Sequence, residues 1–315
     1  HEVSRLVGFV DRCSTTVIDA YLTPTVHKYV KKLKEFTGDI PLKIMQSNGG
    51  LVQASQLRGK NSILSGPAGG VVGSIETSRQ SGREKIVCFD MGGTSTDVAH
   101  CLGKIEYRSK TEIEGISIVA PMVDIHTVAA GGGSVVNFDG VQLKVGPNSA
   151  GSEPGPTCYK RGGPLTITDC NLVLGFLNPK YFPNYFGKDN NQSLDQEIVI
   201  KEFEKLITNS NSREPLKMNI YHAAEGFIKI ANEKMANAIK KISIDKGHDV
   251  RSYSLSCYGA AAGQHCCDVA DLLGVKEIII NNNASVLSAL GIGLANIKKV
   301  LEESIEAIFS INTIE

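Results

Sequence analysis

Apolar positions recur at helical spacing in three long stretches of the chain, Thr16–Phe36, Leu194–Ile207 and Tyr221–Lys246. The third stretch has the clearest apolar stripe: Ala224, Phe227, Ile228, Ala231, Met235, Ala238, Ile239 and Ile242. Gly247 follows it as a helix stop. This periodicity predicts three amphipathic helices, and the first is expected to break or kink at Pro24.

Short apolar runs between these stretches predict β-strands. The runs are Pro41–Met45, Ile86–Phe89, Val123–Val128 and Tyr253–Cys257. Ser285–Val300 is rich in Ala and Gly and is predicted to be a C-terminal helix. Strands that alternate with helices in this way indicate an α/β fold.

Turns of small or polar residues follow four of the predicted strands, near residues 46, 90, 130 and 258. Ligands of open α/β sheets bind beside the carboxyl ends of the strands. One such turn is weak evidence on its own. Four turns on alternating elements predict a nucleotide cleft, because their backbone N–H groups would converge there.

The most informative turn lies in residues 85–100, which read K-I-V-C-F-D-M-G-G-T-S-T-D-V-A-H. Its centre holds two glycines, which let N–H groups approach an anion, and three hydroxyl donors: Gly92, Gly93, Thr94, Ser95 and Thr96. The flanking carboxylates, Asp90 and Asp97, are suited to hold Mg²⁺ through water. These features predict a phosphate-binding turn. The alternative is an ordinary tight hairpin with polar turn residues.

A second candidate phosphate-binding turn follows the Val123–Val128 strand. It consists of Gly131, Gly132, Gly133 and Ser134. Asp124 and His126 lie two residues apart in the strand and therefore share one face. A carboxylate between two apolar residues needs a partner or a metal, so a site role for Asp124 is as well supported as a structural one. For His126 a structural role is favoured.

Composition narrows the class of protein. The chain has 315 residues, 42% of them hydrophobic, which suits one large domain or two lobes. Thirty-three basic and 33 acidic residues balance, so nothing indicates binding to nucleic acid or to a membrane. The eight cysteines form no C-x-x-C pair, and no secretory signal opens the chain. We therefore expect a cytoplasmic protein with reduced thiols, cut from a longer polypeptide because it begins with His1.

Five motifs, in order along the chain, resemble the hydantoinase A/5-oxoprolinase family. They are F-D-M-G-G-T-S-T-D-V, A-A-G-G-G-S, V-G-P-N-S-A-G-S-E-P-G-P-T-C-Y, T-D-C-N-L-V-L-G and Y-G-A-A-A-G-Q-H. The stretches G-F-I-K-I-A-N-E-K-M, K-G-H-D and Y-F-P-N-Y-F-G look most like the ATP-dependent 5-oxoprolinases. The resemblance covers essentially the whole chain, and several motifs in order are far more specific than any one.

The resemblance implies the α/β fold of actin, sugar kinases and heat-shock chaperone ATPases, with ATP between two lobes. Residues 1–75 would form an incomplete N-terminal lobe with a connecting helix, and residues 76–315 the core lobe. Ser65–Gly73 and Ser285–Ile297 resemble the paired connecting helices of that fold, and Cys257–Gly263 resembles its adenosine-binding turn.

Two features depart from the family pattern. An earlier Asp-x-Gly-Gly-Thr phosphate loop is missing, as expected for a piece that lacks half of the nucleotide cleft. The adenosine turn usually reads Phe-Gly-Gly-Ala-Gly, whereas this chain has Tyr258-Gly259-Ala260-Ala261-Ala262. The added methyl groups are expected to weaken nucleotide binding.

The resemblance also implies the activity: ATP-dependent hydrolysis of a cyclic amide, 5-oxo-L-proline to L-glutamate, with Mg²⁺ and a flanking domain or hydantoinase B-like subunit as partner. Residues matching the family motifs would contact ATP: Gly92, Gly93, Thr94, Thr96, Gly131, Gly132, Gly133, Ser134, Gly259, Gly263 and Gln264. Asp90 and Asp124 would be catalytic and hold Mg²⁺ through water. Two alternatives stay open, an ATP-using subunit of an acetone or acetophenone carboxylase-type enzyme and a domain that is inactive in isolation.

Overall fold

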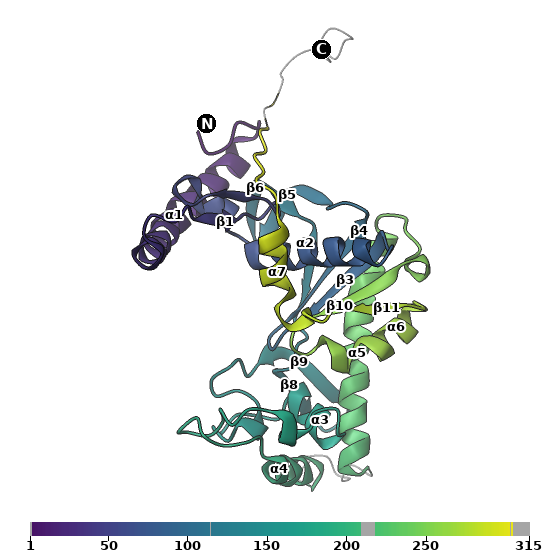
Figure 1. Cartoon of the computed structure of the whole chain (residues 1–315). Helices are drawn as coiled ribbons and strands as arrows, with labels where there is room; N and C mark the ends of the chain where they lie inside the picture. Colours follow the sequence, from purple (N-terminus) through teal and green to yellow (C-terminus); the bar gives the residue numbers. More distant parts are fainter. Residues whose placement is uncertain (1, 114, 209–217, 303, 305–315) are drawn as a thin grey trace. The chain divides into compact units, whose positions relative to one another are not determined.

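The computed structural model describes residues 2–113, 115–208, 218–302 and 304 (Figure 1). The chain divides into two compact units: unit 1 comprises His1–Glu76, Ile105–Asp124 and Ser288–Glu315, and unit 2 comprises Thr77–Lys104 and Ile125–Leu287. This division differs from the expected one, 1–75 and 76–315, in two segments. The described residues of 105–124 and residues 288–302 pack with unit 1 although they are distant from its N-terminal part in sequence.

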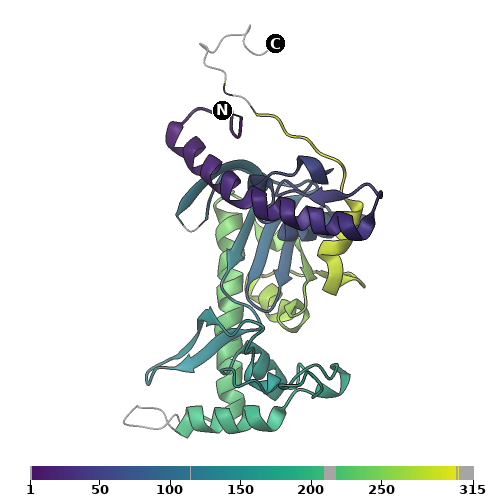
Figure 2. The same cartoon turned by 90° about the vertical axis from the view of Figure 1, so that its left-hand side faces the viewer.

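Unit 1 is built around the long helix α1 (Phe9–Thr37), which packs along β6 (Ile116–Val123). β6 pairs with β5 (Tyr107–Ile113) in an antiparallel hairpin (Figure 2). A shorter antiparallel pair joins β1 (Lys43–Met45) to β2 (Leu51–Gln53). Two small apolar clusters fill the unit, the first made of Val30, Ala54 and Leu57 and the second of Ile118, Ala120 and Met122.

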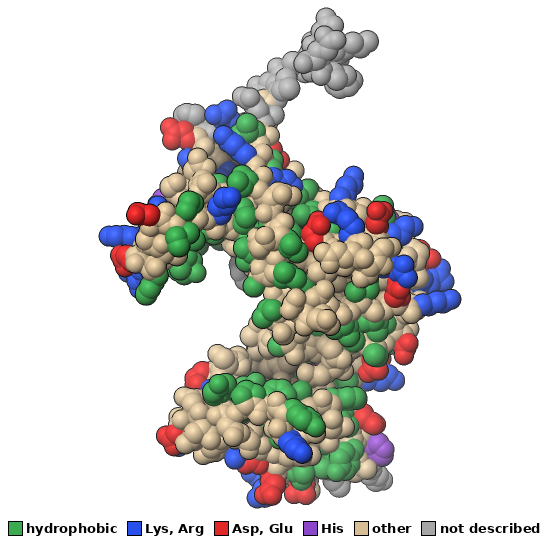
Figure 3. Space-filling model, viewed as in Figure 1, with side chains coloured by type: hydrophobic (Ala, Val, Ile, Leu, Met, Phe, Trp, Pro, Cys, Tyr) green, Lys and Arg blue, Asp and Glu red, His purple; other side chains and the backbone are tan. Residues whose placement is uncertain are grey.

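Helix α1 is continuous through Pro24 and ends at Gly38, so the break predicted at Pro24 does not occur. Its apolar stripe is only partly covered. Val30 is buried, whereas Tyr21 and Tyr29 are 77% and 59% exposed. Figure 3 shows hydrophobic side chains among the Lys and Arg side chains of α1. Among the described helices, none combines the length and the apolar character that crossing a lipid bilayer requires.

Helices α2 (Ser65–Gln80) and α7 (Leu287–Leu294) approach each other at glycines. A Cβ atom on Gly291 would lie 1.9 Å from the carbonyl oxygen of Gly69. A Cβ on Gly69 would lie 2.8 Å from the carbonyl oxygen of Ser288. Two backbones this close leave no room for a side chain, which explains the small-residue composition of Ser65–Gly73.

The C-terminal helix is shorter than predicted, because it ends at Leu294 and not near Val300. The following residues are extended and bond to β2. The N–H of Leu51 donates to the carbonyl oxygen of Asn296, and the N–H of Lys298 donates to that of Leu51. Pairing with an existing strand competes with helix formation in this segment.

Unit 2 contains a five-stranded mixed sheet with the order β11-β10-β3-β4-β7. Its parallel strands are β3 (Lys85–Met91), β10 (Ser254–Tyr258) and β11 (Ile278–Ile280). β4 (Thr96–Leu102) is antiparallel to both β3 and β7 (Ile125–Val128). This mixed sheet, covered by helices, confirms the predicted α/β fold class.

Helix α5 (Ile220–Ile244) packs on β4 and β7 and carries much of the core of unit 2 (Figure 1). Its stripe is the one predicted from the sequence, and the predicted residues are buried. The helices that pack on α5 are α3 (Ile167–Val173), α4 (Gln196–Thr208) and α6 (Cys266–Leu273). A hairpin of β8 (Ser134–Phe138) and β9 (Leu143–Ser149) also belongs to this unit.

Asp169, at the start of α3, orders the loop between β9 and α3. Its buried carboxylate accepts hydrogen bonds from the N–H groups of Thr157, Cys158 and Thr166. The hydroxyl of Thr166 donates to the same carboxylate, which completes a capping box. One buried carboxylate therefore holds the helix start and the Gly- and Pro-rich loop together.

Candidate phosphate-binding site

Three of the four small-residue turns come together in unit 2. The N–H of Gly133, after β7, donates to the carbonyl oxygen of Gly93 at 2.5 Å. The N–H of Ala261, after β10, donates to the carbonyl oxygen of Met91 at 3.0 Å. The fourth turn, near residue 46, belongs to unit 1.

The turn at residues 92–95 connects β3 to β4 as a hairpin, closed by a 3.0 Å hydrogen bond from the N–H of Gly92 to the carbonyl oxygen of Ser95. Within the described chain, three consecutive N–H groups at its tip have no protein acceptor: those of Gly93, Thr94 and Ser95. Successive unpaired N–H groups in a turn form a concavity that binds anions. The hairpin and the phosphate-binding turn, considered above as alternatives, are therefore compatible.

The N–H groups of the second predicted phosphate turn are engaged within the protein. Gly131 donates to the hydroxyl oxygen of Ser134, and Ser134 donates back to the carbonyl oxygen of Gly131. Gly132 and Gly133 donate to carbonyl groups of the 92–95 turn. A Cβ on Gly131 would lie 2.6 Å from the backbone nitrogen of Ser95. This glycine-rich segment therefore packs against the 92–95 turn and holds it through hydrogen bonds.

The two threonines of the motif differ in what they offer a ligand. Thr94 is exposed at the tip of the hairpin. Thr96 is fully buried, and its hydroxyl donates to the carbonyl oxygen of Ala130 and lies 3.3 Å from the sulfur of Met235. The Thr94 hydroxyl is open to a ligand, whereas that of Thr96 is engaged by the core.

Two carboxylates flank the turn, because Asp90 is opposite Asp97 in the β3–β4 register. Burial, followed by the negative charge of Asp97, raises the pKa of Asp90 to about 6. Burial also raises the pKa of Asp97, although the hydroxyl of Thr127 donates to its Oδ1 at 2.6 Å. In the described part of the chain, neither carboxylate has a basic ion-pair partner. Close carboxylates without a counter-charge fit a divalent cation such as Mg²⁺.

The turn after β10 brings its backbone against Asp90. Gly259 has a φ of 88°, and a Cβ there would lie 2.4 Å from Oδ1 of Asp90. Ala262, where the family pattern has glycine, is fully buried in the core. Ala260, the other such position, is exposed, as is Gly263. Only one of the two added methyl groups therefore lies on the open side of the turn.

A buried polar network behind this turn was not identified from the sequence. Nδ1 of His265 lies 2.7 Å from Oδ1 of Asn232, and Nε2 lies 3.0 Å from Nδ2 of Asn171. Burial lowers the pKa of His265 to about 4, so the ring is neutral at pH 7. Nδ2 of Asn171 also donates to Oε1 of Gln264 at 2.7 Å, which fixes that side chain. The available signal was the position of Asn171 and His265 inside the T-D-C-N and G-Q-H motifs.

Asp124 belongs to unit 1, whereas Asp90 belongs to unit 2. The carboxylate of Asp124 is buried and forms an ion pair with Arg108. Its N–H donates to the carbonyl oxygen of Glu106 at 2.8 Å. The partner that a carboxylate between Val123 and Ile125 requires is thus supplied, at least in part, by an arginine.

The chain matches the family model described as Hydantoinase/oxoprolinase over residues 12–300. It is 44% identical to 5-oxoprolinase from Saccharomyces cerevisiae, over 97% of this chain and 24% of that protein. It is 42% identical to 5-oxoprolinase 1 from Arabidopsis thaliana, over 96% of this chain and 25% of that protein. The chain thus spans about a quarter of the length of the 5-oxoprolinases it matches.

Solved structures give the same result. The ATP-dependent caprolactamase from Pseudomonas jessenii is 33% identical, with a TM-score of 0.79 over 94% of this chain and 43% of that one. Nucleotide-free acetone carboxylase is 28% identical, with a TM-score of 0.73 over 86% of this chain and 37% of that one. Sequence motifs, fold and site geometry agree with these matches, and the chain is a member of the hydantoinase/oxoprolinase family.

Proposed function

We propose that the 92–95 turn binds the phosphates of ATP, and that the chain is the ATP-using part of an enzyme that opens a cyclic amide, 5-oxo-L-proline, to L-glutamate. The observation that carries the proposal is the row of unpaired N–H groups at Gly93, Thr94 and Ser95 beside the Asp90–Asp97 pair. Identity of 42–44% to proteins named 5-oxoprolinase supports the substrate.

The chemistry explains why a lactamase needs ATP. A lactam carbonyl is a poor electrophile because nitrogen donates electrons to it. Its oxygen attacks the γ-phosphorus, ADP leaves, and the carbonyl carbon becomes activated. One water adds to that carbon and the C–N bond breaks, which leaves an acyl phosphate and a free amine. A second water hydrolyses the acyl phosphate to carboxylate and phosphate.

The protein contributes positioning and charge neutralisation to such a phosphoryl transfer. The N–H groups of the 92–95 turn and the Thr94 hydroxyl would donate to phosphate oxygens. Asp90, and Asp97 beside it, would hold Mg²⁺ through water, and the ion when bound offsets the phosphate charge. Asp124 remains a second proposed catalytic carboxylate, and its ion pair with Arg108 is the alternative, structural role.

The remaining motif residues have supporting parts in this proposal. Gly131, Gly132, Gly133 and Ser134 hold the phosphate turn in shape, and Thr96 fixes its end to the core. Gly259, Gly263 and Gln264 would lie near the adenosine. Since the chain spans only part of its relatives, flanking domains or a hydantoinase B-like subunit would complete the enzyme.

The test is phosphate release from Mg-ATP with and without 5-oxo-L-proline, by this chain alone and joined to its flanking domains. We expect lactam-dependent release from the joined protein and its loss in Asp90→Asn. Asp139→Asn removes an exposed carboxylate of the same unit and serves as the matched control. Turnover that needs no lactam, or Asp90→Asn turnover near that of the unchanged protein, would refute the proposal.

The likeness to acetone carboxylase supports a second candidate, an ATP-using carboxylase subunit. Its ketone substrate would be activated by the same phosphate turn. The lower identity, 28% against 42–44%, favours the lactam. Assaying acetone with bicarbonate beside 5-oxo-L-proline separates the two candidates. Activity of the joined protein but not of the chain alone would show a domain that is inactive in isolation.

A further inference from the structure

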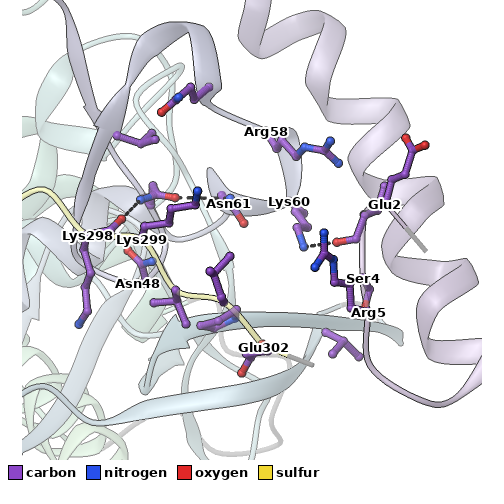
Figure 4. A pocket seen from close by; sticks show the side chains of 18 of the residues that line it. Glu2, Ser4, Arg5, Asn48, Arg58, Lys60, Asn61, Lys298, Lys299 and Glu302 are labelled. Carbon is purple, nitrogen blue, oxygen red and sulfur yellow. Dashed lines mark hydrogen bonds between the residues drawn. The ribbon is translucent and has the colours of Figure 1, made fainter. Parts of the chain in front are cut away.

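Unit 1 contains a cavity of about 530 Å³ that no part of the phosphate site uses (Figure 4). Its walls come from the N-terminal residues 2–6, the turn after β1, residues 58–61 and the extended segment 297–302. All of these segments belong to unit 1. The volume lies in the range of small-molecule sites.

The cavity wall is predominantly basic. Its charged side chains are Arg5, Arg58, Lys60, Lys298 and Lys299 against Glu2 and Glu302. Lys298 is engaged elsewhere, since its Nζ bonds to the hydroxyl of Tyr107. Lys60 donates to the carbonyl oxygen of Val3 and has no ion-pair partner among the described residues. Asp19 and Glu302 attract this ammonium group electrostatically but form no ion pair with it. A half-buried ammonium without an ion-pair partner is suited to an anionic ligand.

Two buried amides, Gln46 and Asn48, also line the cavity, and each is 6% exposed. Gln46 is fixed, because its Nε2 donates to the carbonyl oxygen of Lys298 and its Oε1 accepts from Asn61. Oδ1 of Asn48 accepts the N–H of Gly50 at 2.9 Å. That bond assigns the orientation of the Asn48 amide, and its Nδ2 has no acceptor in the described part of the chain. An amide donor on a cavity wall is available to a hydrogen-bond acceptor of a ligand.

Figure 4 shows Lys60 and Arg5 on one side of the cavity and Asn48 on the other, with Asn61 and Lys299 between them. The apolar part of the wall includes Val119 and Pro121. A complementary ligand therefore has an anionic end, a neutral hydrogen-bond acceptor and a small apolar body.

We infer that this cavity binds a small carboxylic acid that also carries an amide carbonyl, with Lys60 at the carboxylate and Asn48 donating to the carbonyl. 5-Oxo-L-proline belongs to this class. The inference rests on the proposed function for that ligand, and it places recognition of the substrate in unit 1. None of the residues that line the cavity belongs to the proposed phosphate site.

The experiment is calorimetric titration of the chain with 5-oxo-L-proline in the absence of nucleotide. Pyrrolidin-2-one lacks the carboxylate, and cyclopentanecarboxylate lacks the amide. Loss of one charge-assisted hydrogen bond weakens binding about tenfold or more. We therefore expect pyrrolidin-2-one to bind at least about tenfold more weakly than 5-oxo-L-proline. Cyclopentanecarboxylate, which loses a neutral hydrogen bond, should bind about threefold to tenfold more weakly. Equal affinity for the three compounds, or no binding of 5-oxo-L-proline, would overturn the inference.

Three variants assign the binding to the cavity. Lys60→Met should weaken binding of 5-oxo-L-proline about tenfold or more, and Lys60→Arg should restore part of it. Asn48→Asp keeps the acceptor for Gly50 but replaces the open donor by an anion, and should abolish binding. Lys32→Met removes an exposed charge of α1 that lies outside the cavity, so its affinity should be unchanged.

Circular dichroism shows whether Lys60→Met and Asn48→Asp are folded. If one of them is not, the other tests whether the cavity binds 5-oxo-L-proline. The lactam-dependent ATPase assay is run in parallel on the joined protein. If Asn48→Asp or Lys60→Met is folded and keeps both binding and turnover, the cavity inference is wrong and the proposed function stands. If 5-oxo-L-proline binds as expected but the unchanged joined protein does not hydrolyse ATP, the cavity inference is upheld and the proposed function is wrong.

Discussion

Replacing Asp90 by asparagine should make the protein more stable at neutral pH while removing its proposed activity. The pKa of this carboxyl is raised from 3.8 to about 6 by burial and by Asp97. Between these pH values the folded state binds more protons than the unfolded state. The free energy of unfolding therefore falls as the pH rises through this window and stays lowered above about pH 6.

The magnitude follows from the two pKa values. Each tenfold change in proton affinity corresponds to about 1.4 kcal/mol, so the change from 3.8 to about 6 corresponds to about 3 kcal/mol. Partial access of solvent to the carboxylate reduces this figure to about 2–3 kcal/mol. Asparagine has nearly the same shape and no charge. Asp90→Asn should therefore gain about 2–3 kcal/mol over the unchanged protein at about pH 8 and much less near pH 4.

Urea denaturation of both proteins between about pH 4 and pH 8 measures this difference. Asp139→Asn is the control, since hydrogen bonds from Lys144 and from backbone N–H groups lower the pKa of Asp139 to about 2 and its removal should bring no gain. Adding MgCl₂ should stabilise the unchanged protein and leave Asp90→Asn unaffected, because a bound cation favours the charged carboxylate. An Asp90→Asn protein less stable at pH 8, or a difference independent of pH, would refute the reasoning.

Three further predictions concern positions fixed by tertiary contacts. Gly259→Ala should lower the free energy of unfolding, measured by urea denaturation, by about 2–4 kcal/mol, because alanine there has a positive φ and its methyl group meets the Asp90 carboxylate. Gly263→Ala is the control: its methyl group meets open space, so the loss should be less than about 1 kcal/mol. Gly291→Ala should cost about 3 kcal/mol or more, since its methyl group meets the backbone of α2; a smaller loss would show that the helices separate easily. NMR should find the ring of His265 neutral down to about pH 4. The free energy of unfolding should fall as the pH falls from 6.5 to about 4, because His265 is protonated in the unfolded chain before it is protonated in the folded protein. Titration of the ring near pH 6.5 would contradict its burial.

Local patterns predicted much of the fold of unit 2. The stripe of α5 follows from a period of about 3.6 residues, and the buried strand β3 follows from a short β-branched run. The turn at 92–95 was found for a similar reason, because glycines and hydroxyl residues between two acids form a local signal. These features depend on residues that are close in sequence.

Other features depend on residues that are distant in sequence. The sequence pattern did not show that the N–H groups of Gly132 and Gly133 would be engaged within the protein, since their acceptors lie about 40 residues upstream at Gly92 and Gly93. It also did not show that Thr96 faces the core, because that position depends on contact with Met235 of α5. Composition alone does not show whether such polar groups bond within the protein or stay open to a ligand.

The sequence by itself determined the α/β fold class, the family and the position of the proposed phosphate-binding turn, because each is written in periodicity or in contiguous motifs. Only the tertiary structure decided which N–H groups of the turns remain open. It also decided that Asp124 pairs with Arg108, whereas Asp90 has no basic partner among the residues that the structure describes. It also decided that residues 105–124 join the N-terminal unit. Hydrogen bonds and ion pairs are made by whichever groups folding brings within about 3–4 Å, and that proximity is a property of packing and not of sequence order.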